Sequence, residues 1–116
     1  MKKLDMQQLN TLDRLIHEPA RLMIMTLLYT VEEADFLFLQ RTTGLSKGNL
    51  SVHLSKLEQA GYVQIKKTYR GKLPLTLCAL TDSGREAFQR YRQNILHLVT
   101  ATDDDVPPAL SLAPAE

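Results

Sequence analysis

Residues 43–61, TGLSKGNLSVHLSKLEQAG, contain the signals that begin, fill and end one helix. Gly44 can adopt the positive φ of a tight turn, and Ser46 is a preferred N-cap residue because its hydroxyl accepts hydrogen bonds from free amides of the first turn. Leucines follow at helical spacing, and Gly61 suits the position just after a helix. The stretch therefore predicts a helix over residues 46–60 whose leucine face packs on a core.

The face of this helix opposite the leucines carries small, polar or cationic side chains, with no carboxylate before Glu58. A surface helix that is kept soluble by charge usually mixes acids and bases. A helix that enters the major groove of DNA needs short side chains near its start, hydrogen-bonding groups and no negative charge. An ordinary amphipathic helix is the alternative. The candidates for DNA contact on this face and its flanks are Ser46, Lys47, Gly48, Asn49, Ser51, Val52, His53, Ser55 and Lys56.

Two helices are predicted in the first 30 residues. Apolar residues in 3-then-4 spacing predict the first over residues 1–17, and Glu18 and Pro19 end it. Pro19 suits the first turn of the second helix, residues 20–30, because its missing amide needs no partner there. Since this second segment is apolar nearly all round, we expect it to be buried at the centre of the domain.

The segment that leads to Gly44 predicts the first half of a helix-turn-helix. Asp35 can cap a helix over residues 36–42, and the glycine turn then leads into the helix over residues 46–60. Helix, turn and helix in this order are the arrangement in which the second helix recognises DNA. Because many helical hairpins look similar, the sequence that follows is needed to support this interpretation.

The period of the apolar pattern changes from 3.6 to 2 directly after Gly61. Residues 62–67 and 75–80 have strand patterns, and residues 68–74 between them contain the glycine and proline of a hairpin loop. A helix-turn-helix followed at once by a hairpin is a winged helix, so we predict a mainly α fold with a small β-hairpin wing. Four cations of the hairpin are further candidates for DNA contact: Lys66, Lys67, Arg70 and Lys72.

The charges of the chain are unevenly distributed. Residues 46–72 hold six cations and one acid, a net charge of +5, although the whole chain has a formal net charge of only +1. The remainder therefore carries −4, and much of this charge lies in the C-terminal tail. A basic surface on a near-neutral chain is the electrostatic footprint expected of a DNA-binding protein.

The C-terminal part predicts a final helix and then a tail. Thr81 can cap the helix, in which apolar residues repeat with the 3-4-3 spacing of a packing seam. Beyond it the composition changes to acids, Pro and Ala, which cannot bury enough surface to become ordered. We therefore expect one winged-helix domain over residues 1–100 and a disordered tail over residues 101–116.

The apolar seam of the final helix can pack on its own domain or against a second copy of the chain. We favour a homodimer, because the central helix already supplies a core. Two recognition helices about 34 Å apart would then read two half-sites. The predicted dimer interface consists of Leu9, Leu12, Ile16, Phe88, Tyr91, Ile95 and Leu98.

The composition argues against several other kinds of protein. Cys78 is the single cysteine of the 116 residues, which excludes an intramolecular disulfide and a multi-cysteine metal centre. No apolar run approaches the length of a membrane span, and no apolar signal core follows the first residues. We expect a cytoplasmic protein without a metal or cofactor, and the sequence contains no catalytic constellation.

Several short motifs together resemble the small winged-helix transcriptional regulators related to the MarR and ArsR families. The resemblance covers roughly residues 10–95. It implies a bacterial or archaeal homodimer that binds a short inverted repeat near a promoter. The metal-sensing cysteine pairs of the ArsR type are missing, and the effector ligand, if one exists, is unknown. The matching motifs are HEPARL at 17–22, GLS at 44–46, NLSVHL at 49–54, LEQAGYV at 57–63, and LT at 80–81 with Gly84.

Individual residues of the predicted recognition helix are expected to play different parts. Asn49 can hydrogen-bond an adenine edge or hold a phosphate. Lys47 and Lys56 are expected at phosphates, where they add affinity without sequence information. Val52 and Ser55 can touch a thymine methyl group or a base edge, and an exposed β-branched apolar residue has little other reason to stand there.

Residues of the wing and His53 are also expected to contribute to DNA binding. Arg70 and Lys72 at the wing tip can enter a minor groove, whose negative potential attracts cations. His53 lies between the two faces of its helix and can pack or contact a phosphate. We predict a sequence-specific regulator that binds double-stranded DNA and acts as a repressor. A protein-interaction module that has lost DNA binding, or an effector-responsive switch, are the alternatives.

Overall fold

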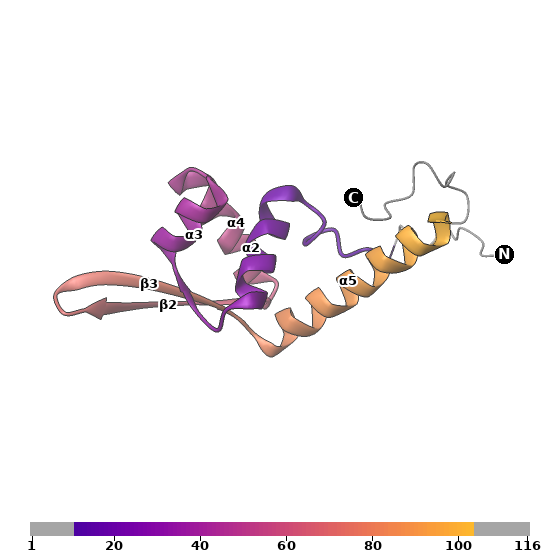
Figure 1. The fold of residues 1–116 in the computed structure, drawn as a ribbon. Coiled ribbons are helices and arrows are strands. Elements are labelled where there is room, and N and C mark those ends of the chain that lie inside the picture. The colour runs from indigo at the N-terminus through magenta and orange to yellow at the C-terminus, as the bar shows by residue number, and fades with distance from the viewer. Residues whose placement is uncertain (1–10, 104–116) are drawn as a thin grey trace.

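The computed structural model describes residues 11–103 (Figure 1). They form a winged helix-turn-helix, so the predicted fold class, mainly α with a β-hairpin wing, is confirmed. A three-stranded sheet with the order β1-β3-β2 accompanies the helices. The elements in chain order are α2 (Pro19–Thr30), β1 (Ala34–Asp35), α3 (Phe36–Thr43), α4 (Lys47–Gln59), β2 (Val63–Arg70), β3 (Leu73–Leu80) and α5 (Asp82–Asp103).

The predicted first helix is wrong where the structure describes it. Residues 11–17 form turns and bends, and residues 1–10 lie outside the described part. The carboxylate of Asp13 accepts hydrogen bonds from the amides of Leu15, at 2.9 Å, and Ile16, at 3.2 Å. An aspartate side chain that bonds nearby amides offers the backbone an alternative to the helical pattern.

Helix α2 lies at the centre of the fold, as its apolar composition predicted. The Glu18 carboxylate caps it by accepting from the amide of Arg21 at 2.8 Å, and Pro19 occupies its first turn. Ile24, Met25 and Leu28 are fully buried. One side of the helix nevertheless faces solvent, where Met23 is 39% exposed.

The turn between α3 and α4 forms as the glycine and the caps predicted. Asp35 accepts from the amide of Phe38 at 2.7 Å, which begins α3. Gly44 has a φ of 75° and donates to the carbonyl of Gln40 at 3.0 Å, which ends α3. The Ser46 hydroxyl then accepts from the amide of Asn49 at 3.1 Å and begins α4. Helix α4 buries Leu50, Leu54 and Leu57.

The wing is longer and its turn tighter than the sequence predicted. Strands β2 and β3 pair from Val63↔Leu80 to Arg70↔Leu73, so the predicted seven-residue loop over residues 68–74 shrinks to two turn residues. Gly71 allows this turn with its φ of 64°. Strand β1, for which no strand was predicted, pairs with β3 at Ala34↔Cys78.

Helix α5 begins in close contact with the root of the wing. The Thr81 hydroxyl caps it by accepting from the amide of Gly84 at 2.9 Å, and it donates to the carbonyl of Gly61 at 2.6 Å. A Cβ on Gly84 would lie 2.0 Å from the carbonyl oxygen of Tyr62, so only glycine fits. The helix continues to Asp103, three residues into the predicted tail, and residues 104–116 lie outside the described part.

Candidate nucleic-acid interface

The outward face of α4 is as open as the sequence predicted. Lys47, Gly48, Asn49, Ser51, Val52 and Lys56 are exposed, Ser46 is exposed at the N-cap, and Ser55 is half-buried. Val52 is 52% exposed although its side chain is apolar. The leucine stripe turns this face away from the core, and the capped first turn fixes its direction. The face presents one valine among short polar side chains and two lysines.

The wing and α4 together border one groove. Residues that line it include Lys47, Ser51 and Ser55 of α4 and Lys67 and Arg70 of β2. Two separate segments of the sequence therefore contribute cations and hydroxyls to one concave surface. Such a surface can contact the phosphates of a duplex while α4 lies in its major groove.

Two of the four predicted wing cations line this groove. Lys67 lines the groove beside α4, whereas its neighbour Lys66 is not among the residues that line it. Arg70 ends β2, and Lys72 stands in the exposed turn. Lys67 and Arg70 therefore share the groove with α4, and Lys66 does not line it.

The structure adds a cation that sequence reasoning missed. Arg41 is exposed in the last turn of α3 and lines the same groove. Its position one turn before Gly44 could have suggested this, because a helix-turn-helix brings the end of its first helix near the start of the second. The charge count that began at Ser46 excluded it.

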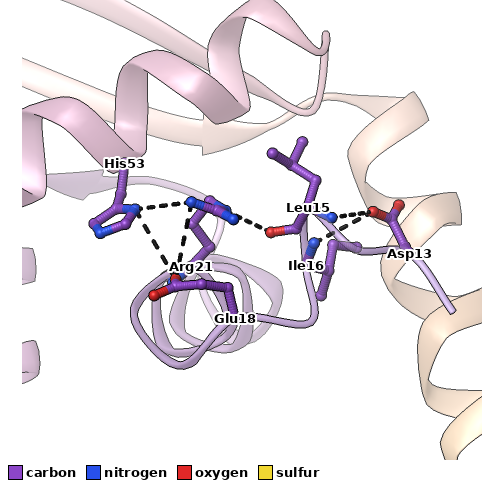
Figure 2. A network of polar contacts seen from close by, with 6 residues as sticks. All are labelled: Asp13, Leu15, Ile16, Glu18, Arg21 and His53. Carbon is purple, nitrogen blue, oxygen red and sulfur yellow. Dashed lines mark hydrogen bonds and ion pairs between the residues drawn. The ribbon is translucent and has the colours of Figure 1, made fainter.

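The Nδ1 of His53 is held at the N-terminal end of α2 (Figure 2). Its Nδ1 lies 3.1 Å from Nη1 of Arg21 and 3.9 Å from the carboxylate of Glu18. The Nε of Arg21 donates to the carbonyl of Leu15 at 2.6 Å. Of the two uses that the sequence left open for His53, packing is the one that this network supports.

The carboxylate of Glu18 has a double role in this network. The backbone amide of Arg21 is the largest influence that lowers its pKa, and the charges of His53 and Arg21 lower it further. A carboxylate that accepts from helix amides is stabilised in its charged form. Glu18 therefore caps α2 and at the same time lies beside the histidine of α4.

A second contact ties the N-terminal segment to the wing. The Tyr62 hydroxyl donates to the carboxylate of Asp13 at 2.5 Å. Burial, followed by this hydrogen bond, raises the pKa of Tyr62 to about 12, so the hydroxyl keeps its proton. Asp13 thus fixes the N-terminal segment against Tyr62, which lies between the end of α4 and the start of β2.

Most of the predicted dimer-interface residues lie inside one chain. Leu12, Ile16, Phe88 and Tyr91 are buried in its core, with exposed fractions of 7% or less. The Tyr91 hydroxyl lies 2.7 Å from Nδ1 of His17. Packing on its own domain therefore accounts for this part of the seam. Two more residues, Ile95 and Leu98, pack partly against the same core, and Leu9 lies outside the described residues.

Groups that could serve chemistry are scarce in the described part of the chain. Between residues 11 and 103, no cluster of three or more His, Cys, Asp or Glu side chains could hold a metal ion. Cys78 is fully buried in β3, and burial raises the pKa of its thiol to about 11. A buried thiol that stays protonated is a poor nucleophile, so Cys78 is a small core residue.

The fold, with the basic groove between recognition helix and wing, defines a winged-helix DNA-binding protein. Residues 20–99, more than half of the chain, match the family described as "Winged helix DNA-binding domain". The chain therefore belongs to this family, which is a family of DNA-binding domains and not of enzymes. The resemblance indicated by the sequence motifs is confirmed. No helix within residues 11–103 is long and apolar enough to cross a membrane.

Similar proteins extend this comparison. An uncharacterized protein of Methanocaldococcus jannaschii is 36% identical over 85 residues, which are 73% of this chain and 92% of that protein. The structure of a transcriptional regulator homologue from Pyrococcus horikoshii OT3 is 28% identical, with a TM-score of 0.76, over 84% of this chain and 95% of its own. The PcaV transcriptional regulator of Streptomyces coelicolor shares the fold, at 17% identity and a TM-score of 0.67, over 89% and 72% of the two chains.

Proposed function

We propose that this protein is a sequence-specific regulator of transcription, which binds double-stranded DNA as a homodimer in the cytoplasm and represses by occupying a promoter. The observation that carries the proposal is the groove shared by α4 and the wing. It gathers Lys47, Lys67 and Arg70 beside the hydroxyls of Ser51 and Ser55. With Arg41, four cations line the groove against two acids, Asp35 and Glu58. This combination suits a helix in the major groove with cations at the flanking phosphates.

Within this proposal the outward residues of α4 divide into two groups. Asn49, Ser51, Val52 and Ser55 set sequence preference, because they can reach base edges and thymine methyl groups. Phosphate contacts set affinity and register but carry no sequence information. The residues proposed for these contacts are Ser46, Lys47, Gly48, Lys56, Lys67, Arg70 and Lys72, to which the structure adds Arg41.

The proposed dimer forms through the second half of α5. Leu96 is 65% exposed and Val99 is 55% exposed, next to the half-buried Ile95 and Leu98. Exposed apolar side chains on successive turns of one helix form a patch that a second copy can cover. Two copies related by twofold symmetry would present two recognition helices to half-sites about 34 Å apart. Leu96 and Val99 thus replace the buried Phe88 and Tyr91 as the contacts to be tested.

The decisive experiment measures binding to the duplex upstream of the protein's own gene and to a shuffled duplex of equal length and composition, across a salt series. We expect tighter binding to the promoter duplex and a steep loss of affinity with salt, because each phosphate contact releases counterions. A footprint would give the number of half-sites. Equal affinity for both duplexes would contradict sequence-specific regulation, and no binding at low salt would favour the protein-interaction module.

A matched pair of variants locates the interface in the same experiment. Lys56→Glu on α4 and Arg90→Glu on the exposed side of α5 change the net charge equally. Only Lys56→Glu should weaken binding strongly, since it places a carboxylate at the phosphates. If both variants lose the same affinity, overall charge and not the α4 face determines binding.

A further inference from the structure

The two most exposed of the large apolar side chains lie at the tip of the wing. Within the described residues, Leu73 is 70% exposed and Tyr69 is 69% exposed, and Pro74 beside them is exposed as well. Neither side chain belongs to the hydrophobic core or the residues packed against it. Apolar side chains gathered at one exposed place indicate an interaction site.

The strand register gives the tip an apolar side chain on both faces. Arg70 pairs with Leu73 and Tyr69 pairs with Pro74. Cross-strand partners share one face of a hairpin, and adjacent residues lie on opposite faces. One face of the tip therefore carries Leu73 beside a guanidinium, and the other carries Tyr69 beside a proline ring. Lys72 stands at the end, in the turn.

No other strand supports this part of the hairpin. Strand β1 pairs with β3 only at Cys78 and Leu77, so the segment from Lys67 to Thr76 has only its own two strands. The hairpin projects from the body of the molecule, on the side away from the end of α5 (Figure 1). A two-stranded ribbon alone is marginally stable in water, and the apolar side chains at its tip add no stability while they are exposed. A ligand that encloses the tip would bury these side chains.

The minor groove of DNA matches the tip in shape and charge. The groove is about 6 Å wide with two walls, so both faces of an inserted tip meet a wall. Its negative potential attracts cations, and residues 63–80 contain four cations and no acid. Apolar side chains, leucine and proline among them, are known to insert into minor grooves between base steps.

We propose that Leu73 and Tyr69 form an apolar wedge that enters the minor groove beside the site read by α4, while Arg70 and Lys72 contact the phosphates. The inference rests on the proposed function and goes beyond it, because it assigns part of the specificity to apolar residues of the wing. Pyrimidine–purine steps open most easily, so the wedge favours operators with such a step in the flank. Leu73 reads this flexibility at positions that α4 does not reach.

The test compares three variants of the full chain on the operator defined by the wild-type footprint. Leu73→Ala should lower affinity about tenfold when the flank contains a TA step, and much less when a GC step replaces it. The slope of affinity against salt should stay unchanged, because no cation is lost. Lys72→Ala should instead flatten the slope by about one unit. Met23→Ala removes an exposed apolar side chain from α2 and should change neither quantity.

A second readout reports the insertion itself. With 2-aminopurine in place of the adenine at the flanking step, fluorescence should rise when the wild-type protein unstacks the base. The rise should be absent with Leu73→Ala at saturating protein. Circular dichroism of the free variant checks folding, which a side chain so exposed should not affect.

Three results would overturn the wedge, and they differ from one another. If the wild type binds its operator but Leu73→Ala behaves like Met23→Ala, the wedge alone is wrong and the regulator remains. If the wild type binds no duplex, the proposed function and the wedge fall together. If Leu73→Ala changes the mass of the free protein in solution, the tip contacts a second copy of the chain and not DNA.

Discussion

Helices α4 and α5 have similar inner sides and different outer sides. Each buries an apolar stripe against the same core. The outer side of α4 has no acid before Glu58, whereas the first half of α5 mixes acids and bases, beginning with Asp82, Arg85 and Glu86. Mixed charge is ordinary for a helix that only has to stay soluble. The buried stripe therefore explains the fold of both helices, and the functional difference between them lies on their outer sides.

Glycines in the first turns of the two helices give the sharpest test of this difference. Gly84→Ala should destabilise the fold by about 3 kcal/mol, because its Cβ would lie 2.0 Å from the carbonyl oxygen of Tyr62. Gly48→Ala meets nothing within 4 Å and should stabilise the fold by about 0.5 kcal/mol. Denaturant unfolding of both variants measures the two changes.

The same glycine pair separates stability from DNA binding. If the start of α4 approaches DNA closely, Gly48→Ala should weaken operator binding although it stabilises the fold. A Gly48→Ala variant that binds DNA as the wild type does would show that the helix start stays away from the duplex. A Gly84→Ala variant of normal stability would contradict the packing of α5 against the wing root.

Substitutions at the apolar end of α5 should have the next largest effect, on dimer formation and operator affinity. The double variant Leu96→Glu, Val99→Glu should be a monomer, because the two charges could not be buried in the proposed dimer interface. Operator affinity should fall more than a hundredfold as one half-site is lost, while helix content stays unchanged. Light scattering measures the mass. Met23→Glu, at an exposed apolar residue of α2 that does not line the groove, is the control, and an unchanged mass for the α5 variant would place the interface elsewhere.

Asn49 tests the sequence-reading part of α4. Asn49→Ala should weaken the free energy of binding to the operator by about 2 kcal/mol, if the side-chain amide makes a bidentate contact to a base. Binding to random duplex should change little. Competition binding with both duplexes measures the difference. Gln93→Ala on the exposed side of α5 is the control and should have no effect. Equal losses on the two duplexes would assign Asn49 to a phosphate.

Removal of the Lys56 charge should have the smallest effect on DNA affinity. Lys56→Ala should weaken binding to operator and random DNA by the same few-fold factor and flatten the salt dependence by about one unit of slope. The free energy of unfolding should change by less than about 0.5 kcal/mol, because the residue is exposed. Arg90→Ala is the control for charge. An unchanged salt slope with Lys56→Ala would remove this lysine from the interface.

Local signals in the sequence were strong enough to predict most of the fold. Asp35, Ser46 and Thr81 cap the helices that they were expected to cap. Gly44 and Gly71 adopt positive φ values in the two turns. Caps, turns and leucine spacing depend on neighbours within a few residues, so a single sequence contains the information needed. The exposed face of α4 followed from the same periodicity.

Two of the wrong or incomplete predictions depended on distant partners. Residues 11–17 have helical spacing, but Asp13 bonds the local amides and the Tyr62 hydroxyl instead. The two residues of β1 form a strand only because β3 lies beside them. Periodicity cannot show either contact, since the partners are about fifty or forty residues away along the chain.

The sequence by itself determined the helix-turn-helix, the hairpin and the basic face, because each rests on short-range spacing and charge. The tertiary structure decided which surfaces remain free. It buried Phe88 and Tyr91 in their own chain, turned His53 toward Arg21, and left Leu96 and Leu73 exposed. Burial depends on how elements pack in three dimensions. An apolar residue at helical spacing therefore has the same pattern in the sequence whether its partner lies in its own chain, in a second copy or in DNA.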